Sequence, residues 1–207
     1  MDTWVIFRIA FFILLGAILF VRMYFNLHIR QQGERIMPDR EAIRREGVGM
    51  FASRVILFFV LIAVLVLYAI NHRWMQAFDF TLPAALRWLG FAIGLFSIAL
   101  LIWTELELGR QFSPQLQLRQ EHQLITAGPY ARIRHPLYTA IDSFGLALAL
   151  VSTNWFFVAF FIICLAGLWF RVPKEEQMML NQFGEDYKAY MQRTGRFLPK
   201  LYRAISR

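Results

Sequence analysis

The stretch Leu137–Phe170, LYTAIDSFGLALALVSTNWFFVAFFIICLAGLWF, decides the fold class of this chain. It is 34 residues long, and Asp142 is its only charged residue. A single straight helix of that length would measure about 51 Å, which exceeds the roughly 30 Å of a bilayer's hydrocarbon core. Ser152-Thr153-Asn154, at its midpoint, has the residue types of turns and helix caps. The stretch therefore predicts two antiparallel membrane helices, over 137–152 and 154–171.

Three further apolar stretches, 4–24, 51–70 and 82–103, are long enough to span a bilayer. Of the 207 residues, 58% are hydrophobic and 17% are charged, whereas soluble domains average about 45–50% and about 25%. The first stretch lacks the basic start and the small-residue cleavage site of a signal peptide, so we expect a retained helix. The sequence thus predicts one all-α polytopic membrane domain with about five transmembrane helices. The last two helices would form a hairpin, followed by a helical C-terminal segment.

Arginine and lysine gather in three segments outside these helices: 24–50, 104–136 and 172–207. By contrast, the 71–81 connection holds only Arg73, and the 152–154 turn holds no basic residue. The positive-inside rule places the three basic segments in the cytoplasm. The N-terminus is then expected outside and the C-terminus inside, which agrees with an odd number of spans.

The remaining composition excludes several classes of function. The net charge of +8 is explained by topology and by contact with anionic lipid headgroups, and no nucleic-acid-binding module is present. Cys164 is the single cysteine, so no intrachain disulfide can form, and the four histidines lack paired metal-ligand spacing. We therefore expect membrane lipids as neighbours, with no nucleic acid and no bound metal. The sequence does not indicate an oligomeric state.

The segment HQLITAGPYARIRHPLY, residues 122–138, concentrates unusual chemistry at a helix start. Gly128-Pro129 indicates a turn, and the residue before Pro136 is biased away from helix. Irregular backbone near membrane depth is tolerated where protein buries it or where it lines a cavity. Two interpretations follow: a ligand-binding loop, or an interfacial anchor in which Tyr130 and Tyr138 form an aromatic belt.

Charged residues at and near the last two spans also allow two interpretations. Arg171 and Glu175 share a helix face if Pro173 begins a new helix. They would then form either a surface ion pair or a pair of charges that faces a cavity. Asp142 lies inside an apolar span and is either a functional group or a polar contact near the helix end.

Taken together, the second half of the chain resembles the isoprenylcysteine carboxyl methyltransferase and phospholipid methyltransferase superfamily of membrane enzymes. The resemblance covers about residues 88–200, whereas the first two helices match only in being hydrophobic. Its motifs are Leu108-Gly-Arg-Gln-Phe-Ser113, His122-x-Leu-x-Thr-x-Gly-Pro-Tyr130, Arg134-His-Pro-x-Tyr138, Arg171-x-x-x-Glu175-Glu176, and the tail motifs Phe183-Gly-Glu-Asp-Tyr187-x-x-Tyr190 and Thr194-Gly-Arg-Phe-Leu-Pro199.

The resemblance implies a cytoplasmic S-adenosylmethionine site built from segments 104–136 and 172–207, and a lipidic or apolar acceptor that enters from the bilayer. Arg171 would bind the acceptor, and Arg171 and Glu175 would be the catalytic residues. The residues implied to bind the cofactor are Gln115, His122, Gln123, Leu124, Ile125, Tyr130, His135, Pro136, Leu137, Tyr138 and Glu175.

The resemblance leaves the chemistry of the acceptor open. A carboxylate needs no general base, and an arginine at position 171 favours an anionic acceptor. An amine acceptor, as in phospholipid N-methylation, would need Glu175, Glu176 or His135 to take its proton. Two functions outside methyl transfer are less favoured: a sterol-reductase-like membrane enzyme that uses NADPH, and a membrane protein without enzymatic activity.

Overall fold

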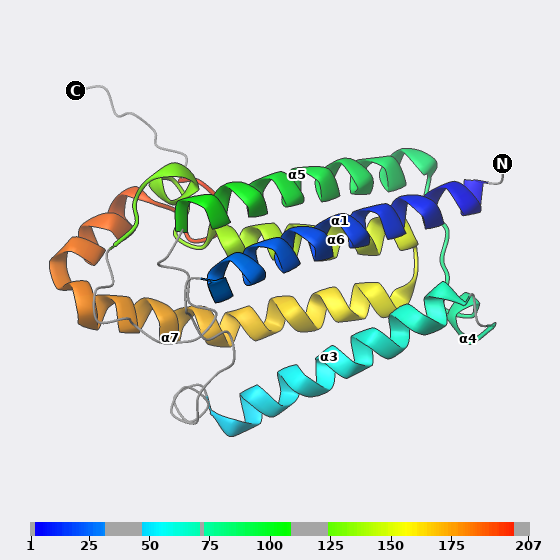
Figure 1. Ribbon diagram of the computed structural model, residues 1–207, viewed down its shortest axis with the longest axis horizontal. Coiled ribbons are helices and arrows are strands. Elements are labelled where there is room, and N and C mark those ends of the chain that lie inside the picture. The colour runs from blue at the N-terminus through cyan, green and yellow to red at the C-terminus, as the bar shows by residue number, and fades with distance from the viewer. Residues whose placement is uncertain (1–2, 32–46, 71–72, 109–123, 201–207) are drawn as a thin grey trace.

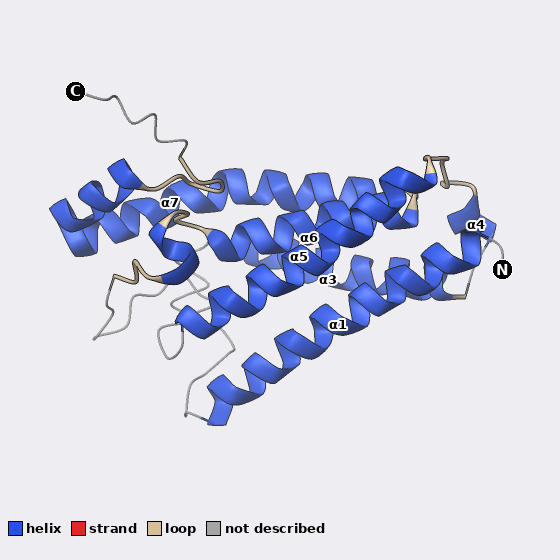
Figure 2. Ribbon diagram, turned by 90° about the horizontal axis from the view of Figure 1, so that it is seen from above, coloured by secondary structure: helices blue, strands red, loops and turns tan. Residues whose placement is uncertain are grey.

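A computed structural model describes residues 3–31, 47–70, 73–108 and 124–200, and in these ranges every regular element is a helix (Figures 1 and 2). The all-α fold class is therefore confirmed. The elements are α1 (Thr3–Gln31), α3 (Val48–Ala69), α4 (Arg73–Gln76), α5 (Ala84–Leu108), the 3₁₀ turn η2 (Gly128–Ala131), α6 (Pro136–Ser152) and α7 (Trp155–Arg193).

The hairpin between α6 and α7 turns at Thr153 and Asn154, as the sequence predicts. Thr153 has a φ of 51°, which ends α6, and the Asn154 side chain accepts a hydrogen bond of 3.0 Å from the Phe156 N–H. The same side chain donates to the Met75 carbonyl at 2.8 Å and to Asp79 Oδ1 at 2.7 Å. The turn is therefore capped from within and held to the α4 segment.

Small residues let α5 pack closely against its neighbours. A Cβ at Gly90 would lie 2.6 Å from Leu150 Cβ, and one at Gly94 would lie 2.6 Å from Leu14 Cδ1. Ser97 also donates a hydrogen bond of 2.8 Å to Ser143 of α6. Small residues and hydroxyl contacts of this kind are the usual means of association between membrane helices.

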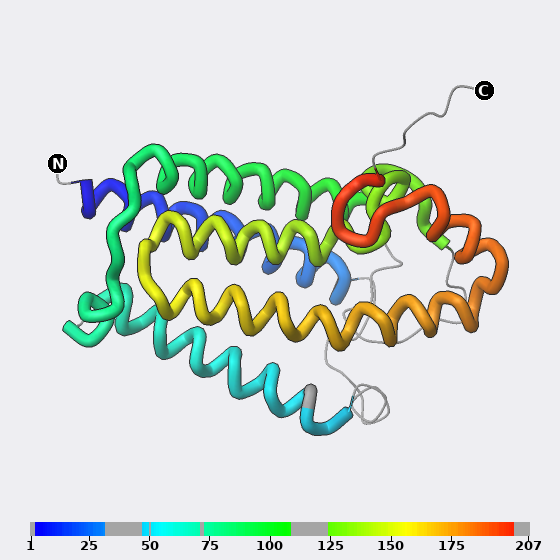
Figure 3. Tube along the Cα trace, turned by 180° about the vertical axis from the view of Figure 1, so that it is seen from behind, coloured from blue at the N-terminus to red at the C-terminus, as the bar shows by residue number. Residues whose placement is uncertain are grey.

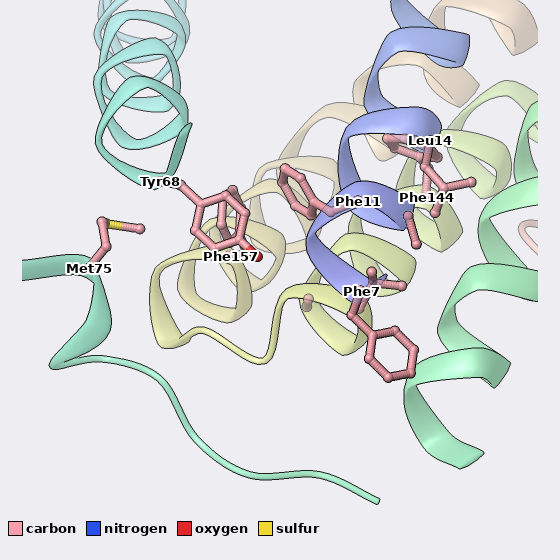
Figure 4. Close-up of a cluster of buried hydrophobic side chains, with 10 residues drawn as sticks. Phe7, Phe11, Leu14, Tyr68, Met75, Phe144 and Phe157 are labelled. Carbon is pink, nitrogen blue, oxygen red and sulfur yellow. The ribbon is translucent and has the colours of Figure 1, made fainter. Parts of the chain in front are cut away.

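An apolar core joins α1, α3, α6 and α7 near the hairpin turn. Phe11 of α1 lies 4.8 Å from the ring of Tyr68 and 4.9 Å from that of Phe157 (Figure 4). The remaining buried members of this cluster are Phe7, Ala10, Leu14, Met75, Phe144, Ala149 and Val151.

Four of the described helices, α1, α3, α5 and α7, are long and apolar enough to cross a membrane. The fifth, α6, has 17 residues, which is at the short end of the range of about 17–25 for a span. The count of five crossings and the cytoplasmic placement of the basic segments stay predictions. Of the four long helices, α3 is the least buried, and it lies along one edge of the bundle (Figure 1).

The helix that begins at Trp155 does not end at residue 171 but continues to a kink at Gly184, beyond which a second helical part of α7 reaches Arg193. Pro173 does not begin a new helix, which was the condition for Arg171 and Glu175 to share a face; it lies inside α7, so the two residues share a face of one continuous helix. Proline removes one helical hydrogen bond, but Val172 and Glu176 on either side of it are buried, and Glu176 is paired with Arg134 and Arg196. The break comes at Gly184, whose φ of 52° and ψ of −121° are not helical.

Candidate active site

The candidate site lies at the end of the bundle opposite the hairpin turn, where α6 begins. Here the C-terminal part of α7 turns back toward the first turn of α6 (Figure 3). The turn is possible because the φ of 52° at Gly184 falls in a region that residues with a Cβ rarely adopt. A single glycine therefore directs the last residues of α7 and the following tail onto the site.

The tail pairs with the segment before α6 through backbone hydrogen bonds. The Arg134 N–H donates to the Gly195 carbonyl at 2.8 Å, and the His135 N–H donates to the Arg196 carbonyl at 3.1 Å. In return the Gly195 N–H donates to the Arg132 carbonyl at 3.0 Å. A Cβ at Gly195 would lie 1.8 Å from the Leu198 carbonyl oxygen, so this close return requires glycine.

Tyr138 connects Arg171 and Glu175 across the hairpin. Arg171 Nε donates to the Tyr138 hydroxyl at 2.7 Å, and that hydroxyl donates to Glu175 Oε2 at 2.8 Å. The Arg171 guanidinium also lies 6.0 Å from the centroid of the Tyr138 ring. A cation, a phenol and a carboxylate are thus linked in one chain, and the two charged groups come from successive turns of α7.

The neighbouring Glu176 faces a different set of partners and is 4% exposed. Its Oε1 accepts hydrogen bonds from Arg134 Nε at 2.9 Å and Arg196 Nε at 3.2 Å, and it lies 3.3 Å from His135 Nε2. Arg196 Nη2 donates to its other oxygen. Burial raises the pKa of Glu176, but the hydrogen bonds from His135, Arg196 and Arg134 outweigh it and hold the pKa well below its usual value. We call these four residues the Glu176 cluster.

Tyr130 lies in η2, close to the groups already described. The Tyr190 hydroxyl donates to the Tyr130 carbonyl at 2.8 Å, which joins η2 to the returning end of α7. Burial raises the pKa of Tyr130 well above its usual value, and nearby Glu175, Tyr190, Glu105 and Tyr138 act in the same direction. The phenol is therefore neutral at physiological pH and lies among groups from α5, α6 and α7.

The structure brings five of the predicted site residues to this region: Tyr130, His135, Tyr138, Arg171 and Glu175. Gln115, His122 and Gln123 lie outside the described residues.

The other predicted residues occupy supporting positions. Leu124 and Ile125 precede η2 and are half-buried, and Pro136 is buried at the first position of α6. Leu137 packs against Leu100, Leu101 and Ala140 in a small apolar cluster. Asp142 is half-buried one turn beyond Tyr138, close enough to Cys164 of α7 to interact electrostatically.

The sequence interpretation missed the Glu176 cluster. It assigned no role to Arg134 or Arg196 and considered Glu176 only as a base for an amine acceptor. Arg134 belongs to the quoted Arg134-His-Pro-x-Tyr138 motif and Arg196 to the tail motif, so the residues were visible although their pairing was not. Two adjacent glutamates on one helix point about 100° apart, which is the signal that Glu175 and Glu176 serve different partners.

Comparisons with known proteins match the part of the chain that contains most of this site. Residues 88–181 match the model of the Isoprenylcysteine carboxyl methyltransferase (ICMT) family. Protein-S-isoprenylcysteine O-methyltransferase B of Arabidopsis thaliana is 30% identical over 94 residues, which are 44% of this chain and 48% of that protein. A probable protein-S-isoprenylcysteine O-methyltransferase of Oryza sativa subsp. indica is 31% identical over 94 residues, 44% of this chain and 49% of that protein.

A solved structure shares the fold. The eukaryotic intramembrane Ras methyltransferase ICMT aligns with a TM-score of 0.56 and 23% sequence identity, over 69% of this chain and 52% of that chain. The present chain spans about half the length of the curated relatives that it matches. Over residues 88–181 the chain is therefore similar to the isoprenylcysteine carboxyl methyltransferase family, and it shares the helical fold of the solved relative.

Proposed function

We propose that the protein is an S-adenosylmethionine-dependent methyltransferase that esterifies the carboxylate of a lipidic acceptor. The hydrogen-bonded chain Arg171–Tyr138–Glu175 carries the proposal. It joins a guanidinium that can bind a carboxylate to a tyrosine ring and a carboxylate that can face a cation, and all three residues lie in the segment that matches the family. An S-prenylated cysteine is the acceptor that the names of the relatives suggest. We expect it to enter sideways from the bilayer and to meet the site on the cytoplasmic face.

The residues present fit a positively charged methyl donor. When bound, S-adenosylmethionine supplies an electrophilic methyl group on a sulfonium. Aromatic faces and a carboxylate suit such a cation, and Tyr138, Tyr130 and Glu175 supply them here. The residues implied to hold the rest of the donor are Gln115, His122, Gln123, Leu124, Ile125, His135, Pro136 and Leu137.

Methyl transfer is an in-line displacement, so the main demand on the protein is alignment. A guanidinium can hold a carboxylate through two parallel N–H bonds, and the bond from Arg171 Nε to Tyr138 fixes its plane. An acceptor carboxylate needs no general base. Glu175 accepts the Tyr138 hydroxyl hydrogen through one oxygen, and in this proposal its role is to hold positive charge rather than to take a proton. Arg171 would thus orient the nucleophile, and Glu175 would hold the electrophile.

The experiment incubates the purified full chain in lipid nanodiscs with S-adenosylmethionine carrying a labelled methyl group. Three acceptors are compared: N-acetyl-S-farnesylcysteine, its carboxamide, and phosphatidylethanolamine. A methyl ester releases labelled methanol in base, whereas an N-methyl group does not.

We expect base-labile label on the farnesylcysteine and none on its carboxamide. Base-stable label on phosphatidylethanolamine would overturn the carboxylate assignment in favour of amine methylation. Absence of transfer to every acceptor, together with oxidation of added NADPH in the presence of a sterol, would overturn the methyltransferase assignment.

A further inference from the structure

We propose that the ion pair between Arg22 of α1 and Glu105 of α5 is a positioning element that seats the η2 turn at the active site. The pair joins a helix outside the family-matched segment, residues 88–181, to the last turns of a helix inside it. The effect on ligand binding rests on the proposed function, whereas the seating of η2 does not.

The pair is buried on one side only. Arg22 Nη1 donates to Glu105 Oε1, and the Glu105 side chain is 1% exposed whereas that of Arg22 is 31% exposed. A carboxylate this deep in the protein is strongly unfavourable unless a cation pairs with it. Arg22 therefore stabilises the position of Glu105 from the rim of the bundle.

The η2 turn rests directly on the same end of α5. Gly128 begins η2 with a φ of 54°, and a Cβ there would lie 2.4 Å from Glu107 Cγ. Glu105 precedes Glu107 by two residues on α5, and it is one of the nearby groups that raise the pKa of Tyr130 in η2, after burial and Glu175. The end of α5 is thus the support for η2, and its conformation determines where Tyr130 stands relative to Glu175.

Among the described residues Arg22 is the cation that pairs with Glu105, and without it the buried carboxyl group must take up a proton or move toward water. Because Glu105 and Glu107 belong to the last turn and a half of α5, such movement frays the support of η2. Removal of both charges leaves no buried ion to resolvate, only a neutral amide whose burial costs less. The two-residue variant is therefore expected to behave better than the variant that lacks only the arginine.

The test measures backbone hydrogen exchange of the ligand-free full chain in nanodiscs. Its reporters are the N–H groups of Tyr130, which donates to the Ala127 carbonyl, and of Arg132 and Ile133, which donate to the Pro129 carbonyl of η2. We expect exchange about tenfold faster in Arg22→Met, since a local opening free energy lower by about 1.4 kcal/mol gives that factor. Exchange at these N–H groups should be slower in Glu105→Gln, which removes the buried charge, than in Arg22→Met. In the double variant Arg22→Met/Glu105→Gln the exchange rate should return toward that of the wild type.

Arg8→Met is the matched control, because Arg8 is also on α1 but donates to the Tyr68 and Ala69 carbonyls near the opposite end of the bundle. It should leave exchange at η2 unchanged. Equal exchange at η2 in Arg22→Met and Arg8→Met overturns the proposal. Exchange in the double variant at least as fast as in Arg22→Met also overturns it.

Titration with S-adenosylhomocysteine separates this proposal from the proposed function. Affinity should fall about tenfold in Arg22→Met and stay within about twofold in Arg8→Met, which corresponds to a coupling of about 1.4 kcal/mol. A wild-type chain that binds no S-adenosylhomocysteine contradicts the proposed function, while the exchange rates at η2 still decide the role of the ion pair.

Discussion

Replacement of Glu176 by glutamine should destabilise the protein far more than the same change at Glu175. The Glu176 carboxylate accepts from Arg134, whose side chain is 8% exposed, and from Arg196, whose side chain is 45% exposed. Breaking a buried ion pair by removal of one partner costs about 3–5 kcal/mol, whereas an exposed pair contributes about 0–1 kcal/mol. Since Arg196 can return to water and glutamine keeps one acceptor, we expect a loss of about 3 kcal/mol.

The assay is thermal unfolding in detergent, followed by intrinsic fluorescence. A loss of about 3 kcal/mol should lower the Tm by about 6–12 °C in a chain of this size. Glu175→Gln is the matched control, because it makes the same chemical change at the neighbouring position, where the one hydrogen bond among the described residues comes from the Tyr138 hydroxyl and an amide oxygen can still accept it. Its Tm should fall by less than about 4 °C. A larger loss in Glu175→Gln than in Glu176→Gln would refute the division between a ligand-facing and a structural glutamate.

The same cluster predicts a dependence of stability on pH. The folded-state pKa of Glu176 is depressed, so its contribution is fully present above the ordinary value of 4.5 and is lost as the pH falls below it. The Tm difference between wild type and Glu176→Gln should therefore narrow as the pH is lowered from 7 toward about 3. A difference that stays constant over this range would contradict the pairing.

Other perturbations test the hinge and the topology. Gly184→Ala should lower the Tm by several degrees, because a φ of 52° with a ψ of −121° is strained for alanine by about 1–3 kcal/mol; an unchanged Tm would show that the return of α7 does not depend on this glycine. A reporter fused after Arg207 should read as cytoplasmic, and one inserted at Thr153 should read as exterior; a cytoplasmic signal at Thr153 would contradict five spans.

The hairpin could be predicted from sequence because length and local chemistry agree. An apolar run too long for one span, with Ser152-Thr153-Asn154 at its centre, allows few other solutions. The contact between Asn154 and Asp79 was not predictable in the same way, since it depends on how α4 packs.

The extent of α7 was mispredicted because a local rule failed. Proline disfavours a helix interior, but here Pro173 lies between the buried Val172 and Glu176, whose carboxylate is held by Arg134 and Arg196. The true break at Gly184 was hidden, because a glycine within a helical pattern is often tolerated without a turn.

The candidate site was partly predictable. The four-residue spacing of Arg171 and Glu175 places them on one face, but their link through Tyr138 is a tertiary contact that no spacing encodes. The Glu176 cluster joins α7 to Arg134 and Arg196, which are 42 and 20 residues away in sequence. Pairings of this kind depend on the fold rather than on local pattern.

The most direct test of the proposed site compares Glu175→Gln and Arg171→Lys by isothermal titration with S-adenosylhomocysteine and S-adenosylmethionine, alongside turnover on N-acetyl-S-farnesylcysteine. Glu175→Gln should lose about ten- to a hundredfold in S-adenosylmethionine affinity, as expected for a charged hydrogen bond of about 1.5–3 kcal/mol. Arg171→Lys should bind the donor normally but turn over slowly, because lysine lacks the planar fork. Poor donor binding by Arg171→Lys with normal binding by Glu175→Gln, or full activity in both variants, would contradict the account.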